Sequence, residues 1–207
     1  MNTIQINASP RTELGKKATK ALRNEGKIPA VLYSKNGVEH FSTTKKDVKG
    51  LVYTPEFKLA EVSLNGAARK AILKDIVFHP VTDAIMHIDL LELVDGHALK
   101  ASVPVKFKGV SPGVKNGGKL MQTLRTVKIK TTPENLIDIL YVDISELELG
   151  FAVRVRDMEV PEGVEVLVDG AAPIANVIVP RAMKSEAANA EDGADAEAET
   201  VEEGAEA

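Results

Sequence analysis

Polar and apolar residues alternate one by one through much of the first 180 positions, and this alternation restricts the fold more than any other feature of the chain. A period of two places successive side chains on opposite faces of an extended backbone, as in a strand with one buried and one solvated face. Asn65-Gly66, between two alternating runs, is the strongest short-range hairpin signal. The runs are TIQINA from Thr3, EVSLNGAARKAIL from Glu61, IMHIDLLEL from Ile85, SVPVKF from Ser102, TVKIK from Thr126, FAVRVRD from Phe151 and GVEVLVD from Gly163. We therefore predict a mainly β protein with antiparallel sheets closed into a barrel or a sandwich.

Two short segments have helical spacing instead. Across residues 14–26, apolar side chains recur every three or four positions and basic side chains occupy the opposite side, which is typical of an amphipathic helix. Gly26 and Pro29 mark its end. A weaker pattern over residues 44–53 contains Gly50, which lowers helix propensity. The apolar sides of the two segments consist of Leu14, Ala18, Ala21 and Leu22, and of Val48, Leu51 and Val52. We predict a short helix in each place.

Charge divides the sequence into three parts. Residues 1–94 contain 14 Lys and Arg against 10 Asp and Glu, residues 95–180 contain 10 against 11, and residues 181–207 contain 2 against 9. From Ser185 onward there is no base and a single valine, so this segment lacks the apolar surface that offsets ordering entropy. We predict a first β domain at 1–94, a second, antiparallel β domain at 95–181 and a disordered acidic tail at 182–207.

Several classes of function are disfavoured by what the sequence lacks. No window approaches the ~18 consecutive apolar residues of a membrane helix, and the start has no secretion signal, so we expect a cytoplasmic protein without a membrane partner. The absence of cysteine excludes thiolate zinc sites and cysteine nucleophiles. No nucleophile, base and orienting group are arranged together. GVKNGGK from Gly113 lacks the ending of a phosphate-binding loop and is interpreted as a flexible turn. We predict that the protein is not an enzyme and has no cofactor and no small-molecule substrate.

His79, His87 and Asp89 form the strongest metal-like set. In a strand that begins at Ile85, His87 and Asp89 lie on the face turned away from the core. A third close ligand is missing, so we predict no metal site. A neutral histidine that donates and accepts hydrogen bonds at a nucleic-acid surface is the better interpretation.

Basic residues are concentrated near the start, inside a chain whose net charge is −4. They are Arg11, Lys16, Lys17, Lys20, Arg23 and Lys27, with Glu13 and Glu25 as the intervening acids. An ordinary solvated helix face remains an alternative, but such a cluster attracts a polyanion by counterion release. With three Tyr, five Phe and no Trp, the chain lacks closely spaced aromatics for stacking single-stranded bases. A double-helical RNA, read through its shallow minor groove, fits better.

Four segments carry a resemblance to a known family: RTELGKKATKALRNEGKIPAVLYS, LKDIVFHPVTDAIMHIDLLEL, GVSPGVKNGGKLMQTLRTVKIK and PENLIDILYVDISELELG. In this order they resemble the bacterial large-subunit ribosomal protein twenty-five family, in its long form known as general stress protein Ctc. The resemblance spans residue 1 to about 181. It implies a β-barrel as the first domain, which binds 5S ribosomal RNA at a helical internal-loop region, and a second β domain. It also implies a ribosomal location in the central protuberance, with other large-subunit components as partners.

The resemblance also implies which side chains contact RNA. By matching position they are Arg11, Lys16, Lys20, Arg23, Tyr33, Lys74 and His87. The chain departs from the family at Gly15-Lys16-Lys17, at Lys20-Ala21, and at Phe78, where a basic residue is usual. The alternatives are an enzyme on a β scaffold, which lacks a candidate site, and a non-ribosomal interaction or stress protein that uses its acidic tail.

Overall fold

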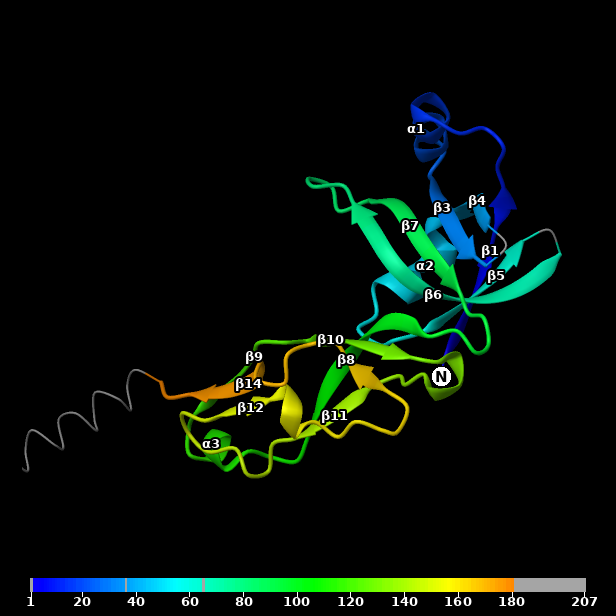
Figure 1. Cartoon of the computed structure of the whole chain (residues 1–207). Helices are drawn as coiled ribbons and strands as arrows, with labels where there is room; N and C mark the ends of the chain where they lie inside the picture. The colour runs from blue at the N-terminus through cyan, green and yellow to red at the C-terminus, as the bar shows by residue number, and fades with distance from the viewer. Residues whose placement is uncertain (1, 36, 65, 181–207) are drawn as a thin grey trace, which may run out of the picture. The chain divides into compact units, whose positions relative to one another are not determined.

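The computed structural model describes residues 2–35, 37–64 and 66–180 (Figure 1). Its strands are β1 (Thr3–Asn7), β2 (Ser9–Pro10), β3 (Lys27–Ser34), β4 (Gly37–Thr44), β5 (Leu59–Leu64), β6 (Ala67–Phe78), β7 (Ile85–Glu92), β8 (Leu99–Lys108), β9 (Lys119–Gln122), β10 (Thr126–Thr131), β11 (Leu140–Asp143), β12 (Ala152–Arg154), β13 (Glu165–Val166) and β14 (Pro173–Ile178). Its helices are α1 (Lys16–Asn24), α2 (Lys45–Val52), α3 (Pro112–Lys115) and the 3-10 turns η1 (Pro133–Asn135) and η2 (Val155–Asp157). A mainly β chain with short helices is confirmed, and both predicted helices form, as α1 and α2.

Seven strands form one sheet in the order β1-β5-β6-β7-β3-β4-β2. Its two edge strands are consecutive in sequence, because Ala8 alone separates β1 from β2. The Ala8 N–H donates to the carbonyl of Ser63 on β5, while Ser9 pairs with Ser42 on β4 at the other edge. Since one residue cannot span an open sheet, the edges meet and the sheet is rolled into a barrel.

Two strand pairings in this barrel are parallel, β1 with β5 and β3 with β7, whereas the other four are antiparallel. The prediction of antiparallel sheets was wrong for these two pairings. Alternation fixes which face of a strand is buried but not the direction of its neighbour. Here β3 and β7 are brought together by a long connection that contains β4, α2, β5 and β6.

The barrel core is built from alternate residues of the strands and from one side of α2. Val48 and Leu51 of α2 are buried in the same cluster as the strand residues, as predicted. Gly50 lies where α2 meets β1, and an added Cβ would stand 3.0 Å from Cδ1 of Ile4. Close packing therefore explains a glycine within a helix. The largest fully buried strand side chains of this cluster include Ile6, Leu32, Phe41, Ile88 and Leu90.

The predicted hairpin forms between β5 and β6, where Leu64 pairs with Ala67. Gly66 has a φ of 82°, in the left-handed region that glycine adopts without strain. Asn65, the other half of the turn signal, lies outside the described residues.

Two further sheets follow, of four strands in the order β11-β8-β10-β13 and of three in the order β12-β14-β9. Two predicted strands are shorter than their alternation. After β12 the Asp157 carboxylate accepts the Arg154 N–H at 2.9 Å and the chain enters η2. After β13 the chain turns at Asp169, whose carboxylate accepts the Ala171 N–H at 3.0 Å. Local hydrogen bonds to aspartate carboxylates thus follow both strands.

The segment GVKNGGK is not a flexible turn, because its start belongs to α3. The Ser111 side chain accepts the Val114 N–H and caps this helix. An added Cβ at Gly113 would lie 2.7 Å from the carbonyl carbon of Glu148. One at Gly118 would lie 2.4 Å from Cγ1 of Val177. Close packing accounts for both glycines.

The chain forms two compact units that are interleaved in sequence. The first comprises Met1–Lys106, Thr126–Leu140 and Glu159–Val168, and the second comprises Phe107–Arg125, Tyr141–Met158 and the chain from Asp169. The seven-stranded barrel lies within the first unit and the three-stranded sheet within the second. The predicted boundary near residue 95 stays a prediction, because the first unit continues through it. The predicted disorder of 182–207 falls outside the described residues.

Candidate RNA-binding surface

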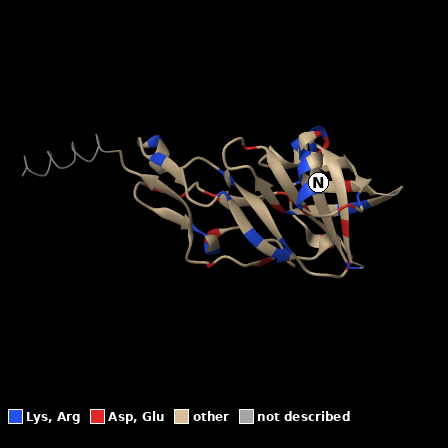
Figure 2. Ribbon diagram, turned by 90° about the horizontal axis from the view of Figure 1, so that it is seen from above, with Lys and Arg blue, Asp and Glu red and all other residues tan. Residues whose placement is uncertain are grey.

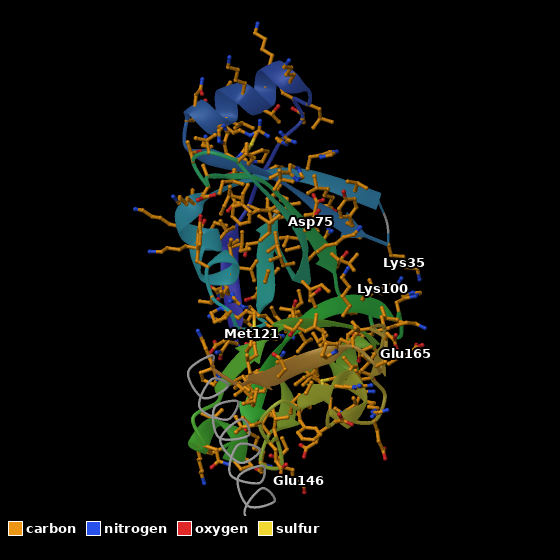
Figure 3. The ribbon with its side chains drawn as sticks, turned by 90° about the vertical axis from the view of Figure 1, so that its left-hand side faces the viewer. Lys35, Asp75, Lys100, Met121, Glu146 and Glu165 are labelled. Carbon is orange, nitrogen blue, oxygen red and sulfur yellow. The ribbon has the colours of Figure 1, made fainter. Side chains whose placement is uncertain are left out.

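Helix α1 presents a basic surface with no acidic residue of its own. It contains Lys16, Lys17, Lys20 and Arg23, and none of its residues is buried. Gly15 begins the helix with a φ of 104°, and the Thr19 hydroxyl donates to the Gly15 carbonyl at 2.7 Å. Figure 2 looks down on this helix, where blue basic positions follow one another, and Figure 3 shows nitrogen-tipped side chains extending from it.

The apolar side of α1 is less buried than its pattern predicted. Leu14 is 54% exposed, and Ala18 and Leu22 are half-buried. This side faces the segment from Pro10 to Glu13 across an open groove of about 350 Å³. The short side chains of alanine do not fill this space, so α1 is a largely exposed helix.

A bulge in β7 ties the end of α1 to the barrel. Val77 pairs with His87 and Phe78 with Ile85, so Met86 has no partner of its own on β6. Nε of Arg23 donates to the Met86 carbonyl at 3.2 Å. Bulges leave ladder groups unpaired and re-aim side chains. Here the bulge anchors an arginine of the basic helix beside His87.

Arg11 lies close to Arg23 and is short of partners. Its backbone N–H donates to the His40 carbonyl at 3.1 Å. Its Nε and Nη1 atoms are shielded from solvent and have no hydrogen-bond partner within the described chain. Burial, with repulsion from Arg23, lowers the pKa of Arg11. An anion held between the two guanidinium groups would relieve both effects.

The outer face of β3, β6 and β7 supplies the remaining predicted contacts. Nζ of Lys74 lies 4.5 Å from the centre of the Tyr33 ring, a cation–π geometry that orients both side chains. His87 and Asp89 face outward as predicted, with Nδ1 of His87 2.9 Å from Oδ1 of Asp89. The two atoms are close, but they do not have hydrogen-bond geometry, and Oδ1 of Asp89 has no hydrogen-bond partner within the described chain. The ring nitrogens of His87 can donate to or accept from a ribose hydroxyl. Asp75, labelled in Figure 3, pairs in register with Asp89 and adds a second acid to this face.

The seven predicted contact residues therefore fall into two neighbouring groups in one compact unit. The first group is Arg11, Lys16, Lys20 and Arg23, and the second is Tyr33, Lys74 and His87. The bond from Arg23 to the Met86 carbonyl brings the first group beside His87, whereas Tyr33 pairs with Leu91, four residues further along β7. Lys27, counted in the basic cluster, is partly neutralised because its Nζ lies 3.0 Å from Oε2 of Glu25.

Sequence reasoning missed the role of Asp89 as the partner of His87. Their spacing of i and i+2 correctly predicted a shared outward face, but it does not predict the distance of 2.9 Å between the two side chains. Sequence reasoning also missed the bulge at Met86, for which the alternation gives no sign.

His79 stabilises the turn that follows it, since its Nδ1 accepts hydrogen bonds from the N–H groups of Val81 and Thr82. Among the residues that the structure describes, no three His, Cys, Asp or Glu side chains gather as metal ligands do.

Comparison with known proteins places the chain in a family. Residues 6–90 match the model of the ribosomal L25p family, and residues 98–181 match that of the C-terminal domain of ribosomal protein TL5. The large ribosomal subunit protein bL25 of Porphyromonas gingivalis is 43% identical over 160 residues, which cover 76% of this chain and 83% of the relative. That of Amoebophilus asiaticus is 38% identical over 191 residues, 92% and 97% of the two chains. That of Phocaeicola vulgatus is 38% identical over 197 residues, 92% and 99%.

The molecule is a β-barrel protein with a basic surface suited to RNA. The chain belongs to the ribosomal L25p family. The resemblance to that family's long form is confirmed, because both parts of the chain are matched. The chain is accordingly a structural, non-enzymatic component of the large ribosomal subunit, located on the ribosome in the bacterial cytoplasm. Across the described residues no helix is long and apolar enough to cross a membrane.

Proposed function

We propose that this chain binds 5S rRNA through its first 94 residues and holds it in the central protuberance of the large subunit. The observation that supports this most is the exposed basic helix α1, which is tied by Arg23 to a sheet face that carries Tyr33, Lys74 and His87. Phosphate contacts fix the position of a protein on RNA, while contacts to sugars and base edges select the site.

The two groups of residues suit these two tasks. The cations of α1 and Arg11 supply charge to the phosphates. Tyr33 and His87 supply a ring and hydrogen-bonding nitrogens on a rigid sheet, which suits the shallow minor groove of an RNA helix. The two acids beside His87 disfavour a phosphate directly over the sheet. The phosphate backbone is therefore assigned to α1 and the groove to the sheet.

Replacing Lys16, Lys20 and Arg23 together by Ala tests this assignment. We expect the plot of log affinity for a 5S rRNA transcript against log salt to flatten by about one unit for each phosphate that the variant no longer binds, so by up to about three. The measurement is a binding titration with the full chain at a series of salt concentrations.

The matched control is the replacement of Lys45, Lys46 and Lys49, three exposed lysines of α2 in the same compact unit. This variant removes the same charge and should leave the slope unchanged. Equal flattening in both variants would show a diffuse charge effect and contradict a site on α1. Failure of the unchanged protein to bind 5S rRNA at low salt would contradict the proposed function as a whole.

A further inference from the structure

The four-stranded sheet has a buried face and an exposed face of unusual composition. Leu99, Ala101, Val103, Val127 and Ile129 are buried. Alternation therefore turns the remaining residues of β8 and β10 away from the core. Within the first compact unit these are Lys100, Ser102, Pro104, Lys106, Thr126, Lys128 and Lys130. Alternation calls for polar residues at such positions, but it does not specify their charge. Four of the seven residues are nevertheless lysine, and none is acidic. We call Lys100, Lys106, Lys128 and Lys130 the lysine face.

The register of the two strands places these charges close together. Lys130 lies directly opposite Lys100, and Lys128 lies opposite Ser102. Like charges directly opposite each other in a sheet are destabilising. All four side chains are exposed, so they are available to a partner.

Glu165 of β13 forms an ion pair with one lysine of this face. It pairs in register with Lys130, and its Oε2 lies 3.0 Å from the Lys130 Nζ. Both side chains are about half exposed or more, so water and salt screen the pair. Figure 3 labels Lys100 and Glu165 on this sheet. Four lysines and Glu165 sum to a charge of +3. A pocket lined by Ser102, Pro104 and Thr126 adds two acids and two bases, which leave this sum unchanged: Glu56, Asp75, Lys58 and Lys74.

We infer that the lysine face binds the phosphate backbone of ribosomal RNA, as a contact separate from α1. Lysine is a flexible point charge that binds phosphate without the planar geometry that reads base edges. The face has neither arginine nor an aromatic ring, so its chemistry suits a backbone and not a base sequence. Family membership supports RNA as the polyanion, because the chain is a component of the large subunit. This inference does not depend on the proposed binding of 5S rRNA.

The test replaces Lys100, Lys106, Lys128 and Lys130 by Gln in the full chain. The variant is added to large subunits prepared without this protein, and its retention is followed through sucrose gradients of rising salt. We expect release at lower salt than for the unchanged chain and a salt slope reduced by about two to four units. The α2 variant, with Lys45, Lys46 and Lys49 replaced by Gln, should be retained like the unchanged chain. Retention of the lysine-face variant equal to that of the unchanged chain would overturn the inference.

Two further measurements separate the alternatives. Thermal unfolding of the lysine-face variant should be unchanged or raised, because like-charge repulsion is removed; a folding defect instead of weaker RNA binding would appear as a lowered Tm. The salt slope of binding to isolated 5S rRNA should be unchanged, because the number of phosphates bound at the 5S site stays the same. If the lysine-face variant loses 5S rRNA in step with the α1 variant, the face is part of the 5S site and the inference of a separate contact is wrong.

The acidic segment 182–207 is the competing occupant of this face. Retention is therefore also measured with chains that end at residue 181. If the lysine-face substitutions weaken retention in these shorter chains as well, RNA is supported as the partner. If they matter only when residues 182–207 are present, the acidic segment occupies the face and RNA does not.

Discussion

Single side chains control local charge in both compact units. Arg69 shows this in the barrel, where Nη1 lies 2.6 Å from Oε1 of Glu39 and Nε lies 3.8 Å from Oε1 of Glu92. The hydrogen bond with Glu39 is the main cause that raises the pKa of Arg69. This arginine is held by partners within the fold, whereas Nε and Nη1 of Arg11 have no hydrogen-bond partner in the described chain. The contrast distinguishes a cation with partners in the fold from the proposed RNA contact at Arg11, which sequence position alone does not do.

Asp143 offers a residue-scale prediction in the second unit. Its carboxylate accepts the Ser145 hydroxyl at 2.7 Å and the Ser145 N–H at 2.8 Å, which lowers its pKa below 3.8. A carboxylate with a depressed pKa stabilises the fold above its unfolded pKa, and this contribution is lost as pH falls through the folded pKa. We expect Ser145→Ala to raise the pKa of Asp143 toward 3.8.

An NMR titration of the Asp143 carboxyl carbon measures this change. Ser63→Ala, at an exposed serine of β5, is the control and should leave the titration as it is. An unchanged Asp143 titration in Ser145→Ala would show that the Ser145 hydroxyl does not lower the pKa of Asp143.

Elements show where sequence reasoning succeeds and where it stops. Alternation locates β1, β5, β6 and β7 because each has one buried and one solvated face. It cannot give the parallel pairing of β3 with β7, since direction depends on contacts distant in sequence. The basic helix α1 is found from spacing, but the bulge that positions Arg23 is not, because it arises from a register shift between two strands.

Helix α3 carries an element-scale prediction. Its Gly113 has no room for a methyl group, since the nearest atoms to an added Cβ are backbone atoms of Glu148 and Leu149 at 2.7 and 2.8 Å. Gly113→Ala forces one backbone away from another, so we expect a loss of about 1–3 kcal/mol in the free energy of unfolding. Denaturant unfolding followed by circular dichroism measures it.

Gly170→Ala is the matched change, because there an added Cβ would meet Arg156 Cβ at an ordinary 3.7 Å. We expect it to change stability by less than about 0.5 kcal/mol. Equal stability of the two variants would mean that α3 moves away from Glu148 at little cost.

At the scale of the whole molecule, the net charge conceals two segments of opposite charge and unequal length. The net charge of −4 combines residues 182–207, with one base and nine acids, and residues 1–181, which carry the difference of −4 and −8, or +4. A low overall pI of about 5.7 is therefore compatible with an RNA-binding surface. The sequence indicated this segregation directly, because charge can be counted without a structure. Which lysines share a face depends on register, and so the lysine face was not predicted.

Removing residues 182–207 tests how the two charges interact. A chain that ends at residue 181 has a charge of +4, and we expect it to bind a 5S rRNA transcript more tightly at low salt, because long-range repulsion of the polyanion is removed. The gain should vanish as the Debye length shortens to a few ångströms near ~1 M salt. A titration at low and high salt measures the difference. Tighter binding that persists at high salt would point instead to direct occlusion of the site by the segment.

Closure of the barrel through Ala8 has a consequence for copies of the protein that have not yet joined a ribosome. An open sheet offers a border of unpaired backbone groups on which a second chain can be templated. In the seven-stranded sheet described above, the first and last strands are neighbours in sequence and only five and two residues long, so each offers a short border. Short terminal strands disfavour edge-to-edge self-association of unassembled copies, while their basic side chains stay exposed to solvent.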